Sequence, residues 1–93
     1  MNTTNLQELI HSEKLVKLIG KRSRKITFSV TPIINDQATL ITFVANHVIV
    51  AKLLVNNGQE VSSPPYCHIL CHPDEKTVLL TIRAIVMAVV PPR

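Results

Sequence analysis

Aromatic residues and glycine are scarce in this chain of 93 residues, which contains no Trp, one Tyr, two Phe and two Gly. Specific recognition of single-stranded nucleic acid usually relies on bases stacked on exposed aromatic rings, and the chain offers few rings for it. The two isolated glycines exclude a glycine-rich phosphate-binding loop and a Gly-x-Ser-x-Gly nucleophile turn. We therefore predict that the protein is not an enzyme and has no catalytic residues.

Charge is also limited, because charged residues make up 17% of the chain and apolar residues 46%. A single domain of this size has too little interior to hide so many aliphatic side chains, so some are expected to face a partner. We predict one domain over residues 1–93 that forms a homodimer or binds a larger protein.

No hydrophobic stretch has the length and purity of a transmembrane helix. Residues 38–55 come closest, but Asn46, His47 and Lys52 interrupt them. The first nine residues do not resemble a secretory signal, which has a basic start and an apolar centre. We expect no membrane span and a cytoplasmic location, where the two cysteines would remain thiols.

Basic residues gather near the start of the chain. The first 25 residues hold six of the ten basic and two of the six acidic residues, so they account for the whole net charge of +4. Such a cluster attracts phosphates or acidic protein surfaces. The candidate residues for binding nucleic acid or another anionic partner are Lys14, Lys17, Lys21, Arg22, Arg24 and Lys25. The alternative is a solvated linker at 21–25 that keeps an apolar protein soluble and contributes little to stability.

The N-terminal segment favours a helix over residues 5–19. Thr4 and Gln7 have the spacing of a capping box, and Gly20 is a natural stop. The apolar residues before and after Ser12 fall on different sides of one helix. We therefore expect a bend or break near Ser12.

Residues 26–90 are predicted to be rich in strands. Residues 26–31 alternate between apolar and polar, and strands are expected at 39–44 and 48–55 on either side of Asn46 and His47. Asn57-Gly58 predicts a tight hairpin turn. β-Branched residues favour a strand over 77–90, with a helix as the alternative. The predicted class is α+β: an N-terminal helix followed by about five mostly antiparallel strands, curled into a small sheet or barrel.

Four potential metal ligands, Cys67, His68, Cys71 and His72, lie within six residues. In a strand, alternation places the two cysteines on the same face. They are four residues apart, however, so their sulfurs would stand about 13 Å apart and could not share an ion. We predict no metal and no cofactor. The face carrying Cys67 and Cys71 is expected to pack on the core and the histidine face to point outward, because cysteine is often buried.

These patterns predict a small non-enzymatic binding or regulatory accessory protein that covers a surface on a larger protein. The alternative is a nucleic-acid-binding protein that uses the basic segment 14–25. A small metalloprotein that uses the cysteine and histidine cluster is the second alternative.

Overall fold

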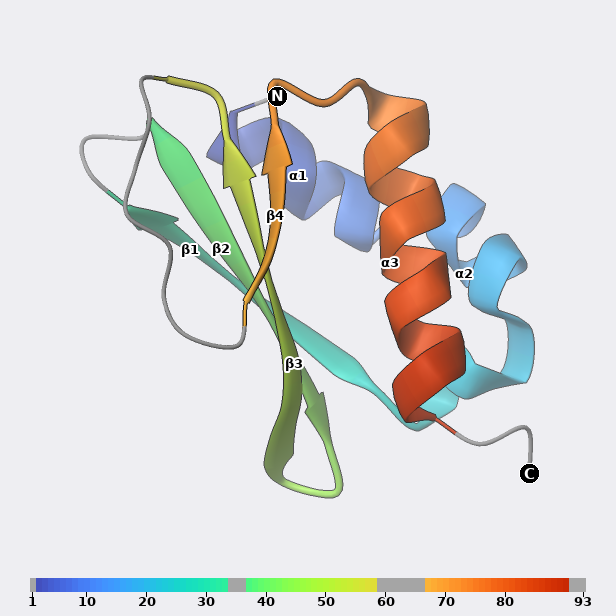
Figure 1. The fold of residues 1–93 in the computed structure, drawn as a ribbon. Coiled ribbons are helices and arrows are strands. Elements are labelled where there is room, and N and C mark those ends of the chain that lie inside the picture. Colours follow the sequence, from blue (N-terminus) through green and yellow to red (C-terminus); the bar gives the residue numbers. More distant parts are fainter. Residues whose placement is uncertain (1, 34–36, 59–66, 91–93) are drawn as a thin grey trace.

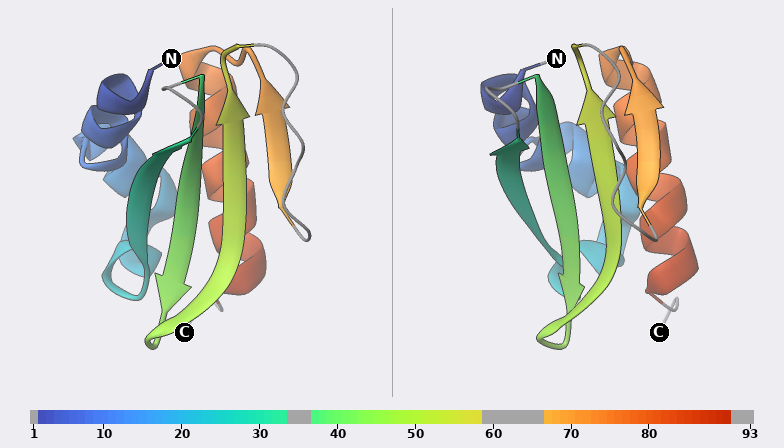
Figure 2. Two further views of the ribbon diagram at one scale, coloured as in Figure 1. Left: turned by 90° about the vertical axis from the view of Figure 1, so that its left-hand side faces the viewer. Right: turned by 60° about the vertical axis from the view of Figure 1, so that its left-hand side comes forward.

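Three helices pack on one face of a four-stranded sheet (Figure 1, Figure 2). The structure is a computed structural model that describes residues 2–33, 37–58 and 67–90. In chain order the elements are α1 (Thr3–Ile10), α2 (Glu13–Ile19), the 3-10 helix η1 (Gly20–Arg24), β1 (Thr27–Ile33), β2 (Ala38–Ala45), β3 (Val48–Asn56), β4 (His68–Cys71) and α3 (Glu75–Val89). The α+β class is confirmed.

The N-terminal helix breaks at Ser12, as predicted. The Ser12 hydroxyl donates a hydrogen bond to the Leu9 carbonyl at 2.6 Å, and its backbone is extended. A side chain that bonds the backbone locally in this way competes with continued helix. In one straight helix, Leu6 and Leu15 would lie on opposite sides. The break turns both of them toward the same core. The predicted cap was wrong: the side chain of Asn2, not Thr4, accepts the Asn5 N–H at 2.8 Å.

The strands follow the order β1-β2-β3-β4, and the first three are antiparallel neighbours. Asn46 and His47 both have positive φ, 53° and 63°, and join β2 to β3. Two such residues form the tight turn whose twist matches that of a hairpin. The predicted interruption at Asn46-His47 is confirmed.

β4 pairs with β3 in parallel, with Leu53 opposite His68. This contradicts the tight hairpin expected at Asn57-Gly58, because a parallel neighbour needs a longer connection. The sheet is therefore mixed and open, with β1 and β4 as its two edges, and it is not a barrel. The part of the chain that the structure describes holds four strands, not about five.

The segment expected to form the last strand is the helix α3. Val78, Ile82, Ile85 and Val86 recur at helical spacing and are all buried. This stripe packs against the sheet and α2, and such burial outweighs the small helix penalty of β-branched residues. The Asp74 side chain caps the helix by accepting the Thr77 N–H at 2.7 Å.

The cap of α3 is expected to fail at low pH. The hydrogen bond from Thr77 lowers the pKa of Asp74 below its ordinary value of 3.8. A carboxyl with a lowered folded pKa stabilises the fold above its unfolded pKa and loses this effect as pH falls through the folded pKa. Asp74→Ala should lower the urea midpoint at pH 7 but have little effect at pH 2. Asp74→Asn can cap the helix at both pH values, so its urea midpoint at pH 7 should be higher than that of Asp74→Ala. Equal midpoints for the two variants at pH 7 would contradict the cap.

The core lies between the sheet and the helices. Ile41 and Phe43 of β2 and Leu53 and Val55 of β3 point toward the helices, and all four are fully buried. The Phe28 and Phe43 rings meet edge to face with centroids 5.2 Å apart. Both rings are therefore used in packing.

Candidate functional site

The six predicted basic residues have different surroundings. Lys14 on α2 forms an ion pair with Glu75 of α3 at 3.2 Å. Arg22 is half-buried, and its Nε donates a hydrogen bond to the Val90 carbonyl at 3.1 Å. The other four are exposed: Lys17, Lys21, Arg24 and Lys25. The structure thus separates two cations that link helices from four that face solvent.

The contact of Arg22 shows that the basic segment is not only a solvated linker. It joins η1 to the end of α3, across 68 positions in the sequence. Arg22→Ala should therefore lower the free energy of unfolding by about 1.5–3 kcal/mol, the usual range for a lost hydrogen bond with a charged group. Lys21→Ala, the matched control next to it, should change it by less than about 0.5 kcal/mol. Equal urea midpoints for the two variants would show that the Arg22 contact has no effect on stability.

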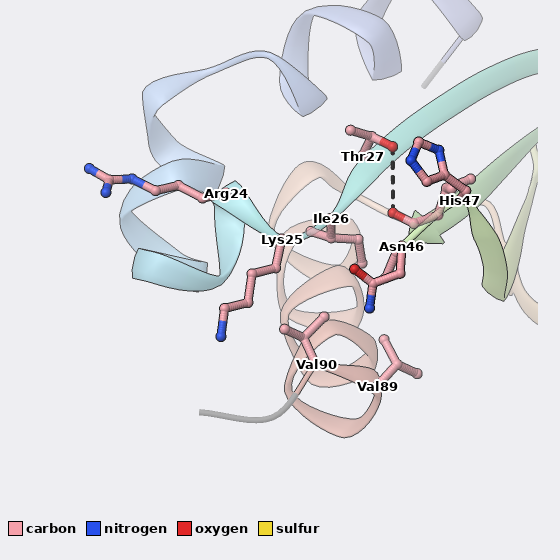
Figure 3. A pocket seen from close by; sticks show the side chains of 10 residues that line it. Arg24, Lys25, Ile26, Thr27, Asn46, His47, Val89 and Val90 are labelled. Carbon is pink, nitrogen blue, oxygen red and sulfur yellow. Dashed lines mark hydrogen bonds between the residues drawn. The ribbon is translucent and has the colours of Figure 1, made fainter. Parts of the chain in front are cut away.

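A cavity of about 650 Å³ opens where the start of β1, the β2–β3 turn and the end of α3 meet (Figure 3). We call it the basic-rimmed cavity. It is lined by Arg24, Lys25, Ile26, Thr27, Val44, Ala45, Asn46, His47, Val89 and Val90. Three segments that are distant in the sequence therefore build one hollow.

The floor of the basic-rimmed cavity is apolar. Ile26 and Val90 lie there with almost no exposed surface, beside the partly buried Val89 (Figure 3). Beside the floor, the Thr27 hydroxyl donates a hydrogen bond to the Val44 carbonyl at 3.4 Å and so joins the start of β1 to β2. An apolar side chain from a partner would find dispersion contacts on this floor.

The rim of the basic-rimmed cavity is polar and positively charged. Arg24 and Lys25 stand at one side, and the Arg24 side chain extends away from the floor (Figure 3). The Asn46 side chain points toward Val89 and Val90 from the opposite side, whereas His47 points away. No acidic side chain is among the described residues that line the cavity. The cations can therefore meet acidic groups beside the cavity rather than an anion inside it.

The sequence identified Arg24 and Lys25 but missed the floor. The sequence pattern predicts a strand for Val89 and Val90, and a strand there does not place them beside Ile26. Asn46 was recognised only as a turn residue. The Asp74 cap, followed by buried residues at helical spacing, is the signal that would have placed Val89 at the end of a helix.

The cysteine and histidine cluster has the reverse orientation to the one predicted. His68 and Leu70 stand opposite Leu53 and Val55, on the face covered by helices, whereas Cys71 is exposed on the other face. Leu70 explains this, because it is the large side chain of β4 that packs on the core. Within residues 2–33, 37–58 and 67–90, no three His, Cys, Asp or Glu side chains are grouped to hold a metal ion.

The Cys67 thiol is not activated by its surroundings. Partial burial raises its pKa, although a backbone hydrogen bond with Leu54 and the charge of Lys52 act in the opposite direction. A thiol with a raised pKa carries little thiolate at neutral pH, and the thiolate is the nucleophilic form. The immediate environment of Cys67 thus gives no support to nucleophilic catalysis.

Comparison of the chain with protein-family models, curated proteins and solved structures finds no match. None of the helices in the described ranges is long and apolar enough to cross a membrane. The geometry of the basic-rimmed cavity is therefore the basis for the function proposed below.

Proposed function

We propose that the protein is a small non-enzymatic binding protein that holds an acidic segment of a larger protein. One apolar side chain of the segment enters the basic-rimmed cavity, and acidic residues on either side of it meet Arg24 and Lys25. The observation that supports this most directly is the combination of a buried apolar floor with an outward-facing cationic rim.

The expected affinity follows from the size of these terms. Burying one aliphatic or aromatic side chain contributes about 1.5–3 kcal/mol, and each exposed ion pair adds about 0.2–1 kcal/mol. Backbone contacts with the Asn46 amide would add a little more. Together these terms amount to about 2–5 kcal/mol, which corresponds to a dissociation constant of about 0.2 mM or weaker. The cations would also accelerate association at low salt.

Nucleic acid fits the site less well. The Phe28 and Phe43 rings pack against each other on the helix side of the sheet, so neither forms a platform for bases. Lys14 is paired with Glu75, which reduces the charge available for phosphates. A phosphate backbone would also gain nothing from an apolar floor. An acidic protein segment with an apolar side chain would use both the apolar floor and the cationic rim of the cavity.

Selection from a library of random short peptides displayed on phage tests the proposal. Wild-type protein should enrich acidic peptides that carry one aliphatic or aromatic residue. The double variant Arg24→Glu/Lys25→Glu should not, and Ala45→Leu, which places extra bulk in the cavity, should weaken the selected peptides about tenfold or more. The matched control Lys17→Glu/Lys21→Glu has the same change in net charge away from the cavity and should retain most of the binding.

Two outcomes would contradict the proposal. One is equal enrichment on the wild type and on Arg24→Glu/Lys25→Glu. The other is tight binding of an RNA or DNA duplex that falls steeply with added salt, with no enrichment of peptides, which would favour the nucleic-acid alternative.

A further inference from the structure

A second hollow, of about 440 Å³, runs between α3 and the edge strand β4. We call it the α3–β4 groove. It is lined by His68, Thr77, Leu80, Thr81, Ala84, Ile85, Ala88 and Val89. None of these described residues is Asp, Glu, Lys or Arg, although the chain carries a net charge of +4. A partner selected by charge, whether acidic protein or nucleic acid, would gain little from this surface.

We infer that a second copy of this chain occupies the α3–β4 groove, with the two α3 helices packed antiparallel about a two-fold axis near Ala84. A two-fold interface joins the same surface of both subunits, so that surface must be complementary to itself. The α3 face meets this condition because it offers both a protrusion and a hollow.

Leu80 supplies the protrusion, with 48% of its surface exposed. Ala84 and Ala88 follow at intervals of four residues, so all three share one side of the helix. Leu80 and Ala88 are equally distant from Ala84. In an antiparallel pair centred on Ala84, Leu80 of each copy therefore lies over Ala88 of the other. The short side chains let the helix axes approach to about 8 Å.

Other exposed surfaces are less suited to a second copy. Lys52 lies opposite Thr42 on the sheet face that the helices leave open, so a face-to-face pair would have to bury its charge. The edge of β1 contains Pro32, which has no N–H to donate to an added strand. The α3–β4 groove has neither obstacle.

Charge near the axis sets the salt dependence. Arg83 is exposed and adjacent to Ala84, so the axis brings the Arg83 side chains of both copies to the same side of the interface. Salt screens like charges that meet in water, so added salt should strengthen the dimer. Binding at the basic-rimmed cavity has the opposite dependence, because salt weakens attraction between opposite charges.

The area limits the strength of the dimer. A helix of 15 residues is about 22 Å long, and one helix face with the edge of β4 covers less than the roughly 800 Å² per partner of a standard interface. Weak complexes are typical of such small interfaces. We therefore expect a dissociation constant of about 10–100 μM.

Sedimentation velocity over a concentration series tests the dimer with no peptide present, so its result is independent of the proposed function. The wild type should shift from monomer toward dimer between micromolar and millimolar concentration. Leu80→Lys should remain monomeric. Ile49→Lys is the matched control, because Ile49 is 56% exposed and does not line the groove, and it should dimerise like the wild type. Far-UV circular dichroism verifies that both variants fold.

Arg83→Gln provides a second test that does not remove an apolar contact. It should strengthen the dimer about threefold at low salt and reduce its salt dependence. A wild type that stays monomeric at millimolar concentration would overturn the inference. So would a dimer that Ile49→Lys disrupts and Leu80→Lys does not, which would place the interface on the sheet, or a dimer that is insensitive to Leu80→Lys.

Discussion

Phe43→Ala is expected to lower the free energy of unfolding by about 3–5 kcal/mol, the usual range for removing a buried aromatic ring. Phe43 has no exposed surface and lies on a central strand of the sheet. Its ring meets Phe28 edge to face and packs in the core shared by the sheet and the helices. Among the described residues, Phe43 is the one aromatic side chain that is fully buried.

The loss is large compared with the total stability. A domain of this length typically has a free energy of unfolding of about 5–14 kcal/mol. Phe43→Ala should therefore shift the urea midpoint to a much lower urea concentration than that of the wild type. Val48→Ala is a suitable control, because Val48 is 58% exposed and its loss should change stability by less than about 0.5 kcal/mol. A change below about 1 kcal/mol for Phe43→Ala, measured by circular dichroism in urea, would mean that the core is placed elsewhere.

Ala84→Pro is expected to lower the free energy of unfolding by about 3 kcal/mol or more. Ala84 is in the middle of α3 and its side chain is exposed, so the effect would arise from the backbone alone. Proline removes a helix hydrogen bond and clashes with the preceding turn. Ala84→Gly, which keeps the N–H, should cost only about 1 kcal/mol. Similar urea midpoints for the proline and glycine variants would contradict a helix at this position.

Local signals predicted the first half of the fold well. The break at Ser12 and the turn at Asn46-His47 depend on side chains and backbone angles within a few residues, so the sequence carries them directly. The strands that flank the turn also follow local alternation and composition. Such features need no knowledge of which segments meet in the fold.

The second half of the fold depends on contacts between distant segments. The β-branched residues of α3 favour a strand by composition, and only their burial against the sheet and α2 makes the helix stable. β4 pairs in parallel with β3, which no local pattern specifies. Leu70 of β4 packs on the core, so Cys71 lies on the opposite face to the one predicted.

The candidate site was predictable only in part, for the same reason. Arg24 and Lys25 stand out by charge in the sequence. The apolar floor combines Ile26 with Val89 and Val90, which meet only because α3 is a helix and ends beside the start of β1. Sequence patterns indicated a basic surface, whereas the hollow behind it required the tertiary structure.

Nuclear magnetic resonance titration of ¹⁵N-labelled protein with a short acidic peptide that carries one central leucine tests the central claim most directly. Binding in the basic-rimmed cavity predicts saturable shifts at Arg24, Lys25 and Thr27, at Asn46, and at Val89, which are absent with Arg24→Glu/Lys25→Glu. A matched peptide with serine in place of the leucine should bind at least about tenfold more weakly, since it cannot fill the floor. Shifts confined to other surfaces, or equal binding of the two peptides, would contradict the proposed function.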